Sequence, residues 1–146
     1  MREAWRRWTL ASALWLGALA WAQPRVEEGT RFLVKLGDTL DTRISRAGDR
    51  VSAVVISPVS LRGGRLEGQV EEASGPRLRF GFHTLRLAGH AVAIRTEITG
   101  VVNSKGNPAR DDLNQVVRIE KGTVIAPGEA VAIHEGAEIR LVGGPR

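Results

Sequence analysis

Three histidines and two closely spaced aspartates are the side chains of this sequence best suited to metal or acid–base chemistry. His90 lies in the sequence Ala-Gly-His-Ala, and His134 is followed directly by Glu135. These three residues can form a metal site only if the two turns meet at one end of the fold. No pair of histidines, His83 included, has the spacing of metal ligands on one helix or strand. We therefore favour solvent-exposed histidines over a metal site and expect no cofactor.

The segment GDTLDT contains Asp38 and Asp41, each followed by a threonine. An aspartic protease requires Asp-Thr-Gly, because the glycine lets the backbone approach the carboxylate pair, whereas Leu40 and Arg43 occupy those places here. The sequence favours a loop in which Asp and Thr side chains accept hydrogen bonds from backbone amides. Nucleophilic catalysis has no better support, because the chain has no cysteine and no serine in a Gly-x-Ser-x-Gly or Ser-x-x-Lys motif.

A polar segment from Gly100 to Gln115, GVVNSKGNPARDDLNQ, interrupts an otherwise regular alternation of apolar and polar residues. Asp111, Asp112 and Asn114 carry oxygens that suit Ca²⁺, but the segment lacks the regular ligand spacing and central glycine of a calcium loop. Long loops in small domains are uncommon without a binding role or disorder. We expect a solvent-exposed connector that contacts a partner protein. The candidate contact residues are Asn103, Lys105, Asn107, Arg110, Asp111, Asp112 and Asn114.

Two structures fit the end of this segment. Asn107-Pro108 can begin a helix that ends at Gly122. Alternatively, QVVRIE forms a strand with Val117 and Ile119 facing inward. Because β-branched residues dominate these last positions, we favour a loop followed by a strand.

Most of the remaining sequence alternates apolar and polar residues with a period of two, the pattern of half-buried strands. In GTRFLVKL, Phe32 and Val34 share one face, while Arg31 and Lys35 point the other way. Similar short runs recur to the C-terminus, separated by glycine or proline. The pattern predicts an all-β fold, a small closed or partly open β-barrel of about 7–9 short antiparallel strands. Because EGTRFLVKL near the start resembles EGAEIRLVG near the end, we expect the N- and C-terminal strands to be adjacent.

One hairpin of this barrel can be predicted in register. A loop over residues 72–76 pairs Val70 with Leu78 and Gly68 with Phe80. The outer face of this hairpin alternates glutamates with arginines, which we expect to form cross-strand ion pairs rather than a site. The inward face holds Leu66, Val70, Leu78, Phe80 and Phe82.

The first 22 residues have the order of a secretory signal peptide: a basic start, an apolar run and a small-residue cleavage site at Ala20-Trp21-Ala22. An uncleaved anchor is the alternative. After removal of residues 1–22, the net charge falls to about +3 and no Trp, Tyr, Cys or Met remains. We expect residues 23–27 to be a linker and residues 28–143 to be a single barrel domain, periplasmic or extracellular, with no transmembrane span. The small charge and the scarcity of aromatic residues argue against nucleic-acid binding.

Residues 28–98 carry a set of motifs found together in one family. Gly29-Thr30 opens a strand, Gly48 leads into a V-x-A-x-V strand, and Gly64 and Gly68 give a Gly-x-x-x-Gly strand. An R-L-x-F strand then ends in an L-x-L-x-G turn. This pattern resembles the periplasmic β-barrel domain of TrbI-like proteins, which belong to conjugation and type IV secretion channels. The chain departs from them in lacking a long Pro-rich region and an apolar helical hairpin.

Together these features predict a non-enzymatic exported β-barrel that serves as a structural or protein–protein interaction module in the bacterial cell envelope. Its expected partners are envelope proteins, with self-association as a further possibility. One alternative is a component of a secretion or conjugation complex. The other is a small metal-dependent hydrolase of the envelope, which would use the histidines with Asp38, Asp41, Asp111 or Asp112.

Overall fold

The computed structural model describes residues 24–102 and 117–146. The predicted signal peptide and most of the polar segment therefore lie outside the described residues. The elements are β1 (Thr30–Leu36), β2 (Leu40–Asp41), β3 (Arg50–Ser57), η1 (Val59–Leu61), β4 (Arg65–Ser74), β5 (Arg77–Leu87), β6 (His90–Val102), β7 (Arg118–Glu120), β8 (Thr123–Ile125), β9 (Ala132–Ile133) and β10 (Glu138–Pro145). No helix in the described part of the chain is long and apolar enough to cross a bilayer.

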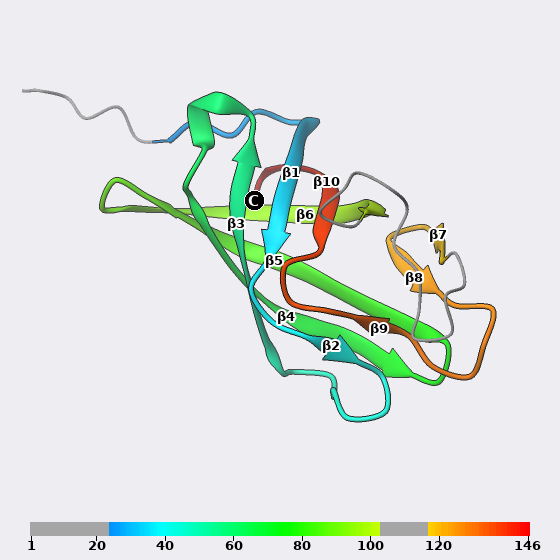
Figure 1. Ribbon diagram of the computed structural model, residues 1–146. Coiled ribbons are helices and arrows are strands. Elements are labelled where there is room, and N and C mark those ends of the chain that lie inside the picture. The colour runs from blue at the N-terminus through cyan, green and yellow to red at the C-terminus, as the bar shows by residue number, and fades with distance from the viewer. Residues whose placement is uncertain (1–23, 103–116) are drawn as a thin grey trace, which may run out of the picture.

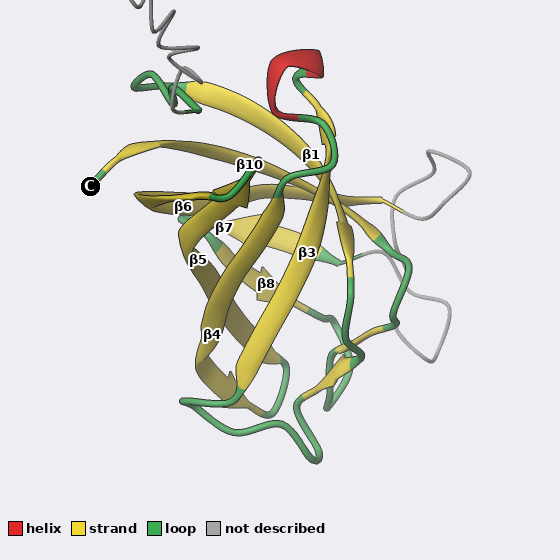
Figure 2. Ribbon diagram, turned by 90° about the vertical axis from the view of Figure 1, so that its left-hand side faces the viewer, coloured by secondary structure: helices red, strands yellow, loops and turns green. Residues whose placement is uncertain are grey.

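Six of these strands form a closed antiparallel barrel, as the alternating pattern predicts (Figures 1 and 2). The strand order is β4-β3-β1-β10-β6-β5, and pairing of β4 with β5 closes it. β1 and β10 are neighbours, with Thr30 opposite Gly143, so the two terminal strands are adjacent as expected. β8 and β7 extend the sheet from β5, and β2 and β9 form a separate pair. In this order β4 and β5 lie across the barrel from β10 and β1.

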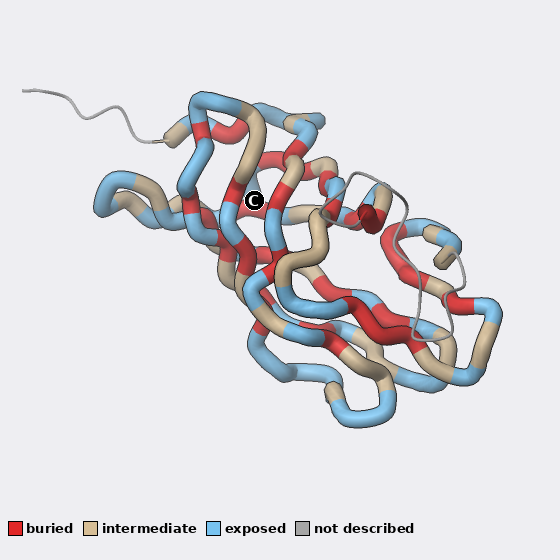
Figure 3. Tube along the Cα trace, in the orientation of Figure 1, coloured by how far each residue is buried: buried red, intermediate tan, exposed pale blue. Residues whose placement is uncertain are grey.

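Buried residues recur along the strands of the barrel (Figure 3), and their apolar side chains form one core. Phe80 and Phe82 meet edge to face, with ring centroids 6.0 Å apart. Val26 packs in the same core, and β10 continues to Pro145. The folded unit therefore extends at both ends beyond the predicted boundaries of 28 and 143, and the predicted linker contributes a core residue.

The predicted register of the β4–β5 hairpin is wrong. The turn contains only Gly75 and Pro76, so that Ser74 faces Arg77 across the hairpin. Gly75 has a φ of 56°, which suits a residue without a Cβ. Val70 consequently pairs with Phe80, and Gly68 with Phe82.

Two register shifts explain why the predicted inward face survives this error. The pairing slips between Val70 and Glu72, and again between Glu67 and Gly68. Each β-bulge inserts one unpaired residue and restores the alternation beyond it. All five residues predicted to face inward are buried: Leu66, Val70, Leu78, Phe80 and Phe82.

The polar segment begins later than predicted. Gly100, Val101 and Val102 belong to β6, and each has a partner in β10. At the other end, β7 forms as the loop-then-strand prediction requires, and Ile119 packs against the core. The boundary error has a simple cause, because a glycine in a strand interior is also a common loop residue.

Candidate binding site

The two turns that carry His134, Glu135 and His90 lie at opposite ends of the barrel. Glu138, four residues after His134, pairs with Val102 at the C-terminal end of β6. His90 begins the same strand, which has 13 residues. At about 3.4 Å per residue an extended strand of this length spans about 40 Å. The three predicted metal candidates are therefore not brought together, and no metal-ligating cluster of three or more residues occurs within 24–102 and 117–146.

Asp38 and Asp41 each accept a hydrogen bond from a backbone amide, that of Ser52 and that of Arg43 respectively. Asp38 accepts hydrogen bonds from the amide and the hydroxyl of Ser52, at 2.7 and 3.0 Å. Asp41 accepts from Arg43, at 2.9 Å from Nε and 2.7 Å from Nη2. The Arg43 hydrogen bonds hold the pKa of Asp41 below its ordinary value. This arrangement matches the expected loop capping. Asp111 and Asp112, the other acids of the hydrolase hypothesis, lie outside the described residues.

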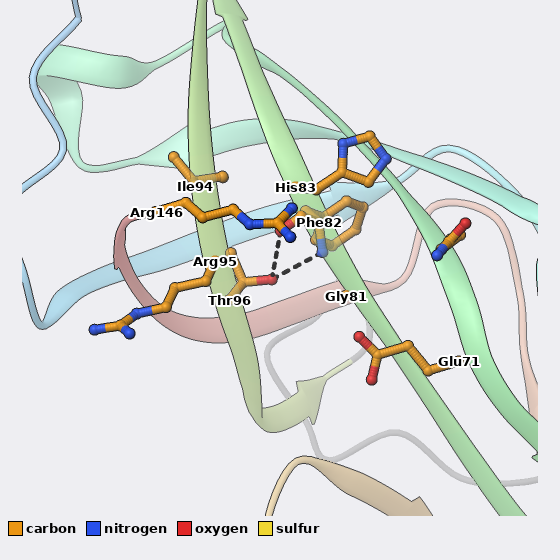
Figure 4. Close-up of a pocket in the computed structure, with 9 residues that line it drawn as sticks. Glu71, Gly81, Phe82, His83, Ile94, Arg95, Thr96 and Arg146 are labelled. Atoms are coloured by element: carbon orange, nitrogen blue, oxygen red, sulfur yellow. Dashed lines mark hydrogen bonds between the residues drawn. The ribbon is translucent and has the colours of Figure 1, made fainter.

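A hollow of about 360 Å³ opens where β5 and β6 separate (Figure 4). The ladder between these strands covers only Thr84–Leu87 and its partners in β6. Beyond it, the hydroxyl of Thr96 replaces the backbone contact by accepting from the amide of Phe82 at 2.9 Å. Glu71 and His83 border the hollow, and the side chain of Arg95 points away from it (Figure 4).

Several polar groups around this hollow already have partners. Glu71 pairs with Arg79 at 2.8 Å, and Arg95 pairs with Glu28 at 2.6 Å. His83 shares a 2.8 Å hydrogen bond with the neighbouring Thr84 hydroxyl. Arg146 also lines the hollow.

A larger hollow of about 680 Å³ lies on the outer face of β1 and β10. We call it the β1–β10 groove. Its side-chain lining is Arg31, Leu33, Ser57, Thr99, Arg140 and Val142, with no acidic residue among them.

Two β-bulges at one level open this groove. Leu33 of β1 is the cross-strand partner of Arg140. At Leu33 the pairing with β3 shifts, leaving Ile56 as an extra residue. At Arg140 the pairing with β6 shifts, leaving Thr99 as an extra residue. Since a bulge bends its strand and redirects side chains, paired bulges on both sides hollow the surface between them.

The centre of the groove has a diagonal arrangement of charge. Arg31 is opposite Val142, and Leu33 is opposite Arg140, so the two arginines lie on one diagonal and the two apolar side chains on the other. Arg31 and Arg140 are exposed, whereas Leu33 and Val142 are half-buried. Val54 continues the apolar surface on β3, with 48 % of its area exposed.

The arginines of the groove differ from three arginines of the β4–β5 hairpin. No ion pair among the described residues involves Arg31 or Arg140. On that hairpin, Arg77, Arg79 and Arg86 each hold a glutamate within 3.0 Å. The hairpin face thus carries the predicted cross-strand ion pairs, and the groove presents cations beside apolar surface.

Sequence reasoning missed this groove, although a signal was present. Leu33 and Val54 occupy outward positions in alternating strands, where polar residues are usual. The predicted contact residues 103–114 lie outside the described part of the chain. They follow β6 directly, and β6 supplies Thr99 to the groove. Comparison with protein-family models and with curated proteins finds no match to this chain.

Proposed function

We propose that the chain is an exported, non-enzymatic β-barrel of the bacterial cell envelope that binds a partner protein through the β1–β10 groove. The observation that carries this proposal is the position of two arginines, with no carboxylate partner among residues 24–102 and 117–146, beside half-buried apolar side chains. The signal-like N-terminal sequence supports export.

Interface energetics favour this surface over the β4–β5 hairpin face. Arginine is enriched in protein interfaces because its planar guanidinium binds carboxylates in a bidentate manner. Leu33, Val54 and Val142 offer apolar area that a partner can remove from water. On the hairpin face, by contrast, a partner would first have to break existing ion pairs.

Nucleic acid is a poor fit to the same surface. Binding of single strands depends on exposed aromatic rings on which bases stack. Phe32, Phe80 and Phe82 are each only 2 % exposed, and no other aromatic residue lies in the described part of the chain. Protein is therefore the favoured class of partner.

A narrower form of the proposal is a subunit of a conjugation or secretion complex. Its support is the resemblance of residues 28–98 to TrbI-like barrel domains. Neighbouring genes for an ATPase and other channel components test this form, and their absence from the gene neighbourhood contradicts it.

Photo-cross-linking in intact cells tests the proposal. A photoreactive amino acid replaces Thr99 in one strain, and in a second strain it replaces Arg86 on the opposite side of the barrel. We expect a discrete cross-linked envelope protein from position 99 and none from position 86. Equal products at both positions, or none at position 99 with the chain exported and folded, would overturn the proposal.

A further inference from the structure

We infer that the β1–β10 groove binds an extended segment of the partner that carries two acidic side chains at positions i and i+2. This inference rests on the proposed function, because it specifies the chemistry of the partner protein at the same groove. It depends on how Arg31 and Arg140 are spaced by the β1–β10 pairing.

The spacing of the arginines matches the repeat of an extended chain. Arg31 and Arg140 are diagonal neighbours, since Arg31 is opposite Val142 and Arg140 is opposite Leu33. Diagonal neighbours of an antiparallel pair lie about 7–8 Å apart. Side chains at i and i+2 of an extended strand are roughly 6.6 Å apart on the same face. Each arginine can therefore meet one carboxylate of an acidic-x-acidic segment, whereas adjacent acids point to opposite faces.

The surroundings of Arg140 leave space for such a contact. Gly100 is its cross-strand neighbour in β6. A Cβ on Gly100 would lie 3.6 Å from Cβ and Cδ of Arg140, so the stem of the arginine lies along the glycine. The described part of the chain gives the guanidinium no carboxylate partner. A carboxylate of the partner can thus form a charge-assisted, bidentate pair with Arg140 without displacing another carboxylate.

The other lining residues suit the remainder of a peptide. Leu33 and Val142 lie between the arginines, where they contact the methylene groups of acidic side chains. Ser57 and Thr99 place hydroxyls at the two sides of the groove, where they can donate to peptide carbonyls. Every type of group in an extended acidic segment therefore has a complementary group here.

An anionic lipid fits less well than a peptide. An acyl chain requires a deep apolar cavity, but Phe32 and Leu141, beneath the groove, are buried within a filled core. The apolar floor of the groove is only half-buried. The shallow, open form of the groove suits a segment lying across it.

Binding of matched peptides to the purified exported chain tests the inference. Three labelled peptides contain the same residues, including two glutamates, at spacings i,i+1, i,i+2 and i,i+3. Fluorescence anisotropy at low salt measures each affinity. We expect the i,i+2 peptide to bind at least about fivefold more tightly than the others. R31Q and R140Q should each weaken it about tenfold and remove the preference for spacing.

A control variant and a competing ligand identify the results that would overturn the inference. R86Q removes an arginine of β5 that pairs with Glu67 and does not line the groove, so it should leave the affinity of the i,i+2 peptide unchanged. Equal binding of all three peptides overturns the inference, as does an equal loss in R86Q. Preferential binding to phosphatidylglycerol vesicles, lost in R31Q, also overturns it by assigning the groove to lipid. If position 99 still cross-links to an envelope protein in that case, the proposed function stands and only the acidic motif fails.

Discussion

Leu33 and Arg140 face each other across β1 and β10, and both neighbouring strands carry an extra residue at this level. A leucine in an outward position thus shares one groove with an arginine that has no carboxylate partner in the described part of the chain. The bulges at Ile56 and Thr99 keep the inner face of the barrel in phase while they open the outer face. The two β-bulges that keep the inner face in phase therefore also form the candidate binding site.

Closure of the barrel at the hairpin depends on the absence of a side chain at Gly68. A Cβ there would collide with the carbonyl oxygen of Gly81 and lie 2.7 Å from Cα of Phe82. We predict that Gly68→Ala lowers the free energy of unfolding by about 3 kcal/mol or more. In Gly100→Ala the new Cβ meets Arg140 at an ordinary 3.6 Å, so this control should change stability little. Urea denaturation measures both, and equal losses would show that close approach at Gly68 is not the cause.

The separation of β5 and β6 depends on the hydroxyl of Thr96. Thr96→Val removes the acceptor for the amide of Phe82 and leaves that half-buried donor unsatisfied. We predict a loss of about 1–3 kcal/mol of unfolding free energy. Thr99→Val is the matched control, because Thr99 is exposed at a bulge and the described residues give its hydroxyl no hydrogen-bond partner. It should stay within about 0.5 kcal/mol of the wild type. A wild-type value for Thr96→Val would mean that another group satisfies Phe82.

Acid weakens the fold through Asp41. Because the Arg43 hydrogen bonds lower the pKa of Asp41 below 3.8, this carboxylate stabilises the native state above that pH. The contribution is lost as the pH falls through the folded pKa. We predict that Asp41→Asn costs about 1 kcal/mol of unfolding free energy at pH 7, with a difference from wild type that shrinks below pH 3.8.

Urea titrations at pH 7, pH 5 and pH 3 measure this difference. Arg43→Gln removes the basic partner of the same ion pair. Its difference from the wild type should show the same dependence on pH as that of Asp41→Asn. A difference between Asp41→Asn and the wild type that is as large at pH 3 as at pH 7 would contradict an origin in the carboxylate charge.

Residues 103–114 are a second candidate contact region. They follow directly after β6, the strand that supplies Thr99 to the groove. We predict that replacing them with a Gly/Ser linker of equal length reduces the recovery of the cross-linked partner from envelope extracts. The thermal unfolding midpoint of the purified chain should change little in the same variant, which separates lost contact from lost folding. Recovery of the same partner in the same amount would remove this segment from the binding surface.

The strand pattern predicted the barrel and its two faces, because a period of two determines which side chains point inward. Phe32 and Val34 are buried and Arg31 and Lys35 exposed, as the alternation requires. The similarity of the terminal segments also predicted the pairing of β1 with β10. These features are local or repeat-based, so they leave a direct trace in the sequence.

Bulges and long-range pairings leave no comparable trace. The hairpin register was wrong because the turn contains two residues rather than five, and because one bulge in β4 and one in β5 shift the pairing while the inward faces are preserved. The groove was missed because Leu33 and Arg140 are distant in sequence and become neighbours only through β1–β10 pairing. The outward-facing Leu33 was the available signal, and its meaning depends on the strand beside it.

The affinity of the cross-linked partner for three forms of the barrel tests the binding account most directly. Isothermal titration calorimetry would compare the wild type with the double variants R31Q/R140Q and R77Q/R86Q. Both doubles remove the same charge, but only the first lies in the groove. We predict that R31Q/R140Q weakens binding by about a hundredfold and R77Q/R86Q by less than about threefold. Equal weakening in the two double variants, or unchanged affinity in R31Q/R140Q, would contradict it.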